Sequence, residues 1–163
     1  MKNILISIDF EKNASLLIDR AVETAVQFDA KIWLVHIAAP DPDFVGYEVG
    51  PQVVRDVRAK ELKEERIMLE KYAQRIQELG IDSQSLLVEG PTVESILKIT
   101  EKLDIDLVVI GHHKRNLFLK ALVGNTDTAL INRSKVPVLI VPLQNSYYSK
   151  EVFFQAEEIV EEV

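Results

Sequence analysis

The sequence lacks cysteine altogether, and it also lacks any long uninterrupted run of apolar residues. Without cysteine the chain forms neither a disulfide framework nor a catalytic thiol, and a cytoplasmic location is the natural expectation. No apolar run approaches the roughly 18 to 20 residues that span a bilayer. Met1 leads within three residues into a short strand and then into acidic residues, so no signal peptide is expected. These absences favour a cytoplasmic protein without a membrane segment.

Positive charge is also scarce. Lysine and arginine number 19 against 26 aspartates and glutamates, which gives a formal net charge of −7. This balance argues against a general binder of nucleic acids or membrane surfaces. Any anion-binding site must therefore be local. The most basic local patch is Lys114-Arg115 together with Lys120.

At 163 residues and 47% hydrophobic composition, the chain suits one domain with a sizeable core. Strand-like runs alternate with helical patterns, and the strands are expected at residues 4–8, 31–37, 83–89, 105–110 and 137–141. This alternation predicts a doubly wound parallel sheet. In the long charged helix expected at residues 53–79, Glu61 and Glu65 are predicted to lie on the solvated side. Ligands of such sheets bind beyond the carboxyl ends of the strands, where the strand order reverses.

The most informative stretch runs from Leu103 to Pro142. An apolar run ends at Gly111, a basic loop follows, and Gly124 with Asn125 precedes a helix and a second apolar run. Glycine lets a backbone approach a ligand closely, and free N–H groups at a helix N-terminus favour an anion. The same residues also suit a simple strand end and a helix cap, so the pattern alone leaves both interpretations open.

The spacing in this stretch resembles the nucleotide-binding signature of universal stress proteins: glycine, two residues, glycine, nine residues, glycine, and then serine or threonine. Here Gly111, Lys114, Gly124 and Asn125 occupy the four positions. The resemblance covers about residues 1 to 142 and includes the first, second and last strands. It implies a Rossmann-like, five-stranded parallel sheet in the order 3-2-1-4-5. The domain would span residues 1–142, followed by an acidic tail at 143–163.

The resemblance also implies an adenine nucleotide, ATP or else ADP or AMP, with Mg²⁺ as a candidate companion. Asp9 matches the family's ribose-contacting aspartate, and Ile37 matches its apolar residue beside the adenine. A carboxylate has the right chemistry to accept two ribose hydroxyls, although a helix-capping aspartate and a core isoleucine remain open alternatives. The predicted nucleotide-binding residues are Asp9, Ile37, Gly111, His113, Lys114, Gly124, Asn125 and Thr126.

Two identities depart from the family signature. Lys114 replaces the middle glycine, and its side chain either blocks the phosphates or pairs with them through its ammonium group. Asn125 replaces the serine or threonine but still suits a helix cap, and Thr126 supplies a hydroxyl one position later. The double-His loop, His112-His113, is similar to the branch of the family whose members do not bind ATP tightly. The alternative function is therefore a dimeric interaction module of the same family that binds no nucleotide.

The two histidines do not predict a metal centre, because adjacent residues on an extended loop point to opposite sides and no third ligand lies at suitable spacing. The sequence shows no nucleophile elbow, no P-loop and no evident general base. A phosphoacceptor receiver domain has the same architecture, but it needs an aspartate after the third strand, where Glu89-Gly90 stands, and a lysine after the fifth. We therefore expect a stress-response regulator rather than a fast enzyme, with slow nucleotide hydrolysis left open.

The last apolar strand, Val138 to Val141, raises the question of a partner. In the family's strand order it lies at an edge of the sheet, where unpaired N–H and C=O groups favour pairing with a second copy. Pro137 and Pro142 limit the length of that pairing. We expect a homodimer through this strand and an unidentified protein partner, but neither nucleic acid nor membrane.

Overall fold

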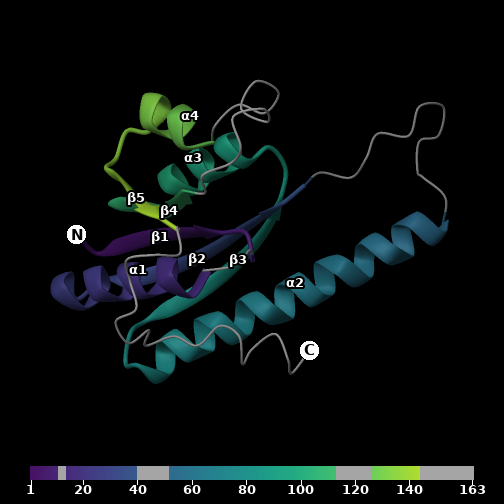
Figure 1. Ribbon diagram of the computed structural model, residues 1–163, viewed down its shortest axis with the longest axis horizontal. Coiled ribbons are helices and arrows are strands. Elements are labelled where there is room, and N and C mark those ends of the chain that lie inside the picture. Colours follow the sequence, from purple (N-terminus) through teal and green to yellow (C-terminus); the bar gives the residue numbers. More distant parts are fainter. Residues whose placement is uncertain (11–13, 40–51, 113–125, 144–163) are drawn as a thin grey trace.

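The structure, a computed structural model, describes residues 1–10, 14–39, 52–112 and 126–143. Within them, strands and helices alternate along the chain, as the sequence predicts (Figure 1). The elements are β1 (Asn3–Ile8), α1 (Ala14–Phe28), β2 (Lys31–Ala38), α2 (Gln52–Glu78), β3 (Ser83–Glu89), α3 (Thr92–Lys102), β4 (Leu107–His112), α4 (Thr126–Arg133) and β5 (Val138–Pro142).

Strand β4 begins two residues later than the sequence predicts. The chain leaves α3 through Asp104, whose φ of 49° is left-handed, and the N–H of Ile105 still donates to the carbonyl of Thr100 at 3.0 Å. The first residues of the apolar run therefore finish the helix end, and the strand continues instead to His112. This shift brings His112 into the sheet.

All five strands are parallel and lie in the order β3-β2-β1-β4-β5, which confirms the predicted sheet. The chain builds outward from β1 to β3 on one side and then crosses to place β4 and β5 on the other. The strand order therefore reverses between β1 and β4. Because all strands run the same way, their carboxyl ends meet at one edge, which we call the carboxyl edge.

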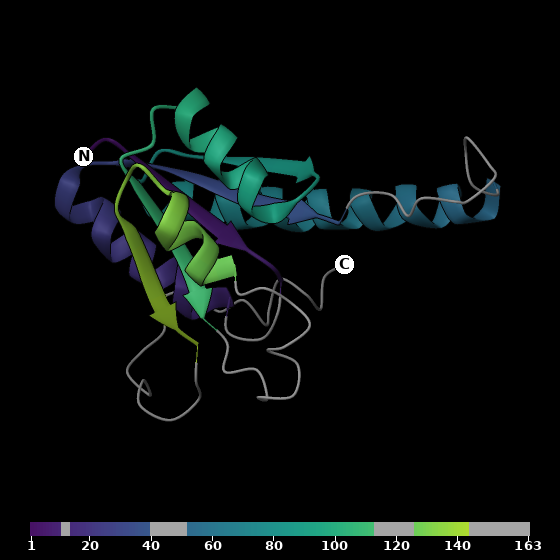
Figure 2. The ribbon, with the colours of Figure 1, turned by 90° about the horizontal axis from the view of Figure 1, so that it is seen from above.

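Helices cover both faces of the sheet, as Figures 1 and 2 show. Residues such as Ile6, Leu34 and Val109 point to one face and pack with α1 and α2. Their neighbours Leu5 and Val35 point to the other face, where α3 and α4 lie. We refer to these as the α1–α2 face and the α3–α4 face. Because successive side chains of a strand point to opposite faces, burial of both faces gives nearly continuous apolar strands.

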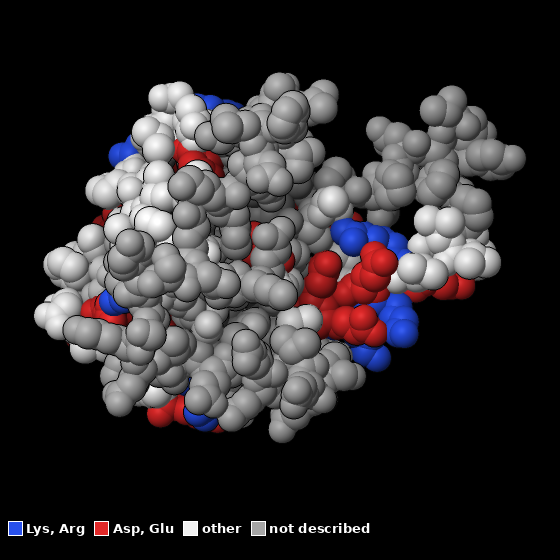
Figure 3. All heavy atoms as spheres, in the orientation of Figure 1, with Lys and Arg blue, Asp and Glu red and all other residues white. Residues whose placement is uncertain are grey.

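Helix α2 has 27 residues, or about 40 Å of length, and only part of it lies on the sheet. Its buried side chains belong to the C-terminal part, whereas the N-terminal part extends beyond the sheet (Figures 1 and 2). There Val53 is 73% exposed and Val57 is 53% exposed. Acidic and basic side chains alternate along this part of the helix (Figure 3), and ion pairs such as Arg58–Glu61 at 3.3 Å join successive turns.

The amino ends of the strands are joined by a carboxylate that precedes β4. Asp106 accepts hydrogen bonds from the backbone N–H groups of Lys2 at 2.6 Å and Asn3 at 3.0 Å. These hydrogen bonds, the one from Lys2 first, lower the pKa of Asp106. The start of β1 is thus held beside the start of β4. None of the helices in the described ranges is long and apolar enough to cross a membrane.

Candidate ligand site at the carboxyl edge of the sheet

The reversal of strand order places the end of β1 beside the end of β4. In the pairing of these strands Ser7 lies opposite Ile110, and the same register continued by two residues brings Asp9 level with His112. On the other side of β1, Ile8 pairs with His36, so Asp9 is level with Ile37. Asp9, Ile37 and His112 therefore form one row across three neighbouring strands, where doubly wound sheets bind their ligands.

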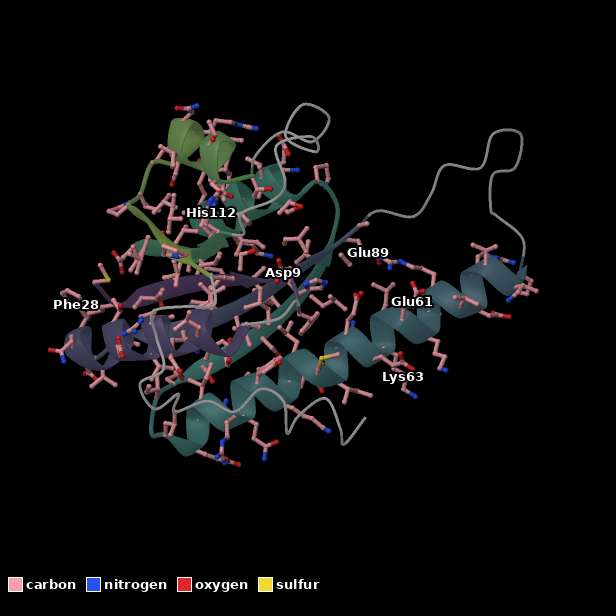
Figure 4. The ribbon with its side chains drawn as sticks, viewed as in Figure 1. Asp9, Phe28, Glu61, Lys63, Glu89 and His112 are labelled. Atoms are coloured by element: carbon pink, nitrogen blue, oxygen red, sulfur yellow. The ribbon has the colours of Figure 1, made fainter. Side chains whose placement is uncertain are left out.

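All three side chains of this row belong to the α3–α4 face by the alternation of their strands. Ile8 and Phe10, which flank Asp9, both pack on the opposite face. Phe10 has a left-handed φ of 55°, so the chain turns immediately after Asp9. Figure 4 shows the labelled Asp9 and His112 near the ends of their strands. Asp9 is exposed, which leaves its carboxylate accessible from solvent.

Ile37 has a second role beside its place in the row. It is partly buried and packs against the core cluster of the α3–α4 face, which includes Leu5, Val35 and Ile96. The structure shows the core interpretation of this residue, and its contact with an adenine stays a prediction. Its side chain contributes to the core and lies at the outer rim of that core.

Gly111 is not held in a conformation that only glycine adopts. It lies in β4, pairs with Val141, and has none of the positive φ values that Gly80 and Gly90 show. The space that a side chain of Gly111 would fill is occupied by Leu143. A Cβ atom at Gly111 would lie 3.1 Å from the Cγ of Leu143. That space is on the α1–α2 face, where Leu143 is buried. In the described residues, the side-chain space at Gly111 therefore serves packing on the face opposite Asp9 and His112.

A histidine and an aspartate meet beside the row. Nδ1 of His112 makes a hydrogen bond and ion pair with Oδ2 of Asp127, which lies in the first turn of α4. The sequence analysis considered His112 as a metal ligand and as part of the double-His loop but missed this pair, because the partners are 15 residues apart. The signal that could have found it is the alternation of β4, which puts His112 on the side where the following helix packs.

Of the remaining predicted site residues, the structure describes Thr126 but not the others. Thr126 is the first residue of α4 and is partly buried, next to Asp127. His113, Lys114, Gly124 and Asn125 lie outside the described residues. The structure thus brings Asp9, Ile37 and Thr126 to the carboxyl edge on the α3–α4 face, together with the unpredicted pair of His112 and Asp127.

On the opposite face, His36 is part of the support of this edge. Its Nδ1 lies 2.7 Å from the carbonyl oxygen of Ile8, and its ring centroid is 4.5 Å from that of Phe10. Its Nε2 lies 3.7 Å from Oε2 of Glu65. The prediction that Glu65 lies on the solvated side of α2 is wrong: its side chain is only 25% exposed, because this turn of the helix faces the end of β2.

Acidic groups dominate the described part of the carboxyl edge. Asp9 follows β1 and Glu89 ends β3 (Figure 4), and Asp127 lies in the first turn of α4. Among residues 1–10, 14–39, 52–112 and 126–143, no three histidine, cysteine or acidic side chains come close enough to hold a metal ion. The cations that could balance a phosphate, Lys114 and Arg115, follow His112 in the sequence. Both residues lie outside the described ranges.

The fold and this edge define a class: parallel α/β proteins with a ligand crevice where the strand order reverses. The family profile described as "Universal stress protein family" matches residues 1–142. The chain belongs to the universal stress protein family. It is 30% identical over 149 residues to universal stress protein A of Salmonella typhi, an alignment that covers 88% of this chain and 96% of the relative.

Solved structures of this family share the fold. A universal stress protein from Burkholderia pseudomallei superposes with a TM-score of 0.67 at 24% identity, covering 86% of this chain and 96% of the other. One solved in complex with cAMP gives 0.66 at 19% identity, over 88% and 98% of the two chains. One from Archaeoglobus fulgidus, in complex with dAMP, gives 0.57 at 17% identity, over 86% and 97%. At these identities the likeness shows the fold alone.

Proposed function

We propose that this protein binds an adenine nucleotide at the carboxyl edge, between the ends of β1 and β4, and acts as a stress-response regulator in the cytoplasm rather than as a fast enzyme. The observation that carries the proposal is the row of Asp9, Ile37 and His112 on the α3–α4 face, at the reversal of strand order. Two relatives with the same fold were solved with cAMP and with dAMP, which supports an adenine nucleotide as the ligand.

The described residues offer the chemistry for a nucleoside. The carboxylate of Asp9 can accept hydrogen bonds from two ribose hydroxyls, and Ile37 offers an apolar surface to the flat base. Phosphates would extend past His112 toward the start of α4, whose N–H groups favour an anion. In the sequence, the basic residues Lys114 and Arg115 lie between these two elements. Thr126 supplies a hydroxyl at that helix start. Mg²⁺ is a candidate companion of the phosphates.

Replacement of Asp9 by alanine tests this assignment. The loss of a charged acceptor of two hydroxyls is expected to weaken the binding of AMP, ADP or ATP by about 10-fold or more. Calorimetric titration of the purified full chain, with and without magnesium, measures this change. Glu89→Gln is the matched control, because it removes a carboxylate from the same edge beyond β2, away from the crevice.

Two outcomes would contradict the proposal. If none of the three nucleotides gives heat at millimolar concentration, the proposal of nucleotide binding is wrong, and the remaining candidate function is an interaction module. The observation that favours this second candidate is the N-terminal part of α2, which presents exposed Val53 and Val57 beyond the sheet. Equal affinity of Asp9→Ala and the unsubstituted protein would instead place the nucleotide elsewhere on the chain.

We further propose that two copies pair through β5. This strand is the edge strand beside β4, and Leu139 is 38% exposed on it. Pairing two edges satisfies their free N–H and C=O groups and covers this side chain. Leu139→Glu is therefore expected to shift the protein from dimer toward monomer by at least about 10-fold in dissociation constant. Sedimentation equilibrium measures the shift, and an unsubstituted protein that sediments as a monomer would contradict the dimer.

A further inference from the structure

We propose that His112 is a general base that activates water for slow hydrolysis of a bound nucleoside triphosphate, and that Asp127 is the residue that positions it. The proposal rests on the nucleotide binding proposed above. It adds the catalytic group that the sequence alone did not reveal.

The hydrogen bond between the two side chains determines which nitrogen of His112 is available. An ionised carboxylate only accepts hydrogen bonds, so Asp127 receives the proton that Nδ1 carries. Nε2 then keeps its lone pair, and the ring is held in the tautomer that a general base requires. Among the described residues Nε2 has no hydrogen-bond partner, and the His112 side chain is 36% exposed, so the ring is partly open to solvent.

Both members of the pair are held by ordered parts of the fold. His112 ends β4 opposite Pro142, and its carbonyl accepts the N–H of Leu143 at 3.0 Å. Asp127 belongs to α4, which is anchored in the core of the α3–α4 face by the fully buried Leu130. A pair fixed by a strand end and a helix start keeps its geometry better than a pair carried by a loop.

The position of the pair is suited to phosphate chemistry. His112 lies in the row with Asp9 by register, so a nucleoside held by Asp9 would direct its phosphates past the imidazole. In the sequence the pair brackets residues 113–125, which carry Lys114, Arg115 and Gly124. Among the described residues, the other histidine near this edge is His36, which lies buried on the α1–α2 face with its Nδ1 2.7 Å from a backbone carbonyl oxygen, so the sheet separates it from this chemistry.

In the proposed step, Nε2 of His112 accepts a proton from water while the water oxygen forms a bond to the terminal phosphorus. The bond from that phosphorus to the bridging oxygen breaks, and its electron pair leaves with the nucleoside diphosphate. The products are the diphosphate and inorganic phosphate, and the imidazolium returns its proton to solvent. Asp127 stabilises the imidazolium through the hydrogen bond to Nδ1.

Single-turnover hydrolysis of ATP with magnesium by the full-length protein, beside calorimetric affinities on the same samples, tests this role. His112→Gln and Asp127→Asn are expected to slow the hydrolysis by about 100- to 10,000-fold, with affinities within about 3-fold of the unsubstituted protein and unchanged melting temperatures. Glu94→Gln, which removes a carboxylate at the start of α3 that pairs with Arg133, is the matched control and should keep the rate. Added imidazole should restore hydrolysis to His112→Ala.

The outcomes separate this inference from the proposed function. Nucleotide binding without turnover, or turnover that survives both substitutions, would overturn the dyad and leave the binding proposal intact. Parallel losses of affinity, turnover and melting temperature would show that the pair only holds α4 against β4. An acid-labile phosphate found on His112 would show that this residue acts as a nucleophile and not as a general base. Absence of any nucleotide binding would overturn both proposals.

Discussion

Replacing Gly111 with alanine is expected to lower the free energy of unfolding by about 1–3 kcal/mol, the usual penalty for inserting a methyl group into a filled core. The new Cβ would meet Leu143, whose Cγ lies 3.1 Å from that position, and Leu17 lies close behind. Leu143 has little freedom to move, because it is buried and its N–H is bound to the carbonyl of His112. Urea denaturation followed by circular dichroism measures the loss.

As a control, the same substitution is made in a protein that already carries Leu143→Ala. In that variant the space beside Gly111 is open, and the same Gly111→Ala change should cost less than half as much. Nucleotide affinity should then survive in the double variant, because the added methyl group points to the α1–α2 face. An equal penalty in both backgrounds, or a loss of affinity without a loss of stability, would show that Gly111 serves the ligand directly.

Leu69→Ala is expected to destabilise the fold by about 2–5 kcal/mol. Leu69 is buried at the point where α2 meets the sheet, near Tyr72 and Ile76. Tyr72 shares this environment, since burial raises the pKa of its hydroxyl group. The truncation leaves a cavity in the C-terminal part of α2, through which the helix packs against the core. Chemical denaturation with a matched exposed variant measures the effect.

Ile67→Ala is that matched variant, because it removes an aliphatic side chain from the exposed side of the same helix. Its cost should stay below about 0.5 kcal/mol, as for other surface substitutions. Equal losses from Leu69→Ala and Ile67→Ala would contradict the packing of α2 through its Leu69 side alone.

The sheet was predictable from the sequence because burial on both faces leaves a direct signature. Only strands covered on two sides carry runs such as Ile4–Ile8 and Ile32–Val35, and helices between such strands require parallel pairing. The strand order was predicted from the family resemblance, and the structure confirms it. Asp9 follows β1 and Ile37 lies near the end of β2, so both lie near the carboxyl edge, while their contact with a nucleotide stays a prediction.

The rest of the site could not be predicted, because it depends on contacts between distant residues. The pairing of His112 with Asp127 needs the packing of α4 onto β4, which no local pattern encodes. The filling of the space beside Gly111 depends on where the chain goes after β5. Helical periodicity predicts that Glu65 lies on the solvated side of α2. Its side chain instead lies beside the buried His36 of β2, with 3.7 Å between Oε2 and Nε2.

The central claim is that a nucleotide binds at the carboxyl edge on the α3–α4 face, and amide chemical shifts of the isotope-labelled protein titrated with AMP test it most directly. The account predicts saturable shifts at Asp9, Ile37, His112 and Thr126, with Tyr72 and Ile76 on the α1–α2 face unmoved. Shifts concentrated on the α1–α2 face, or none at millimolar AMP, would contradict it.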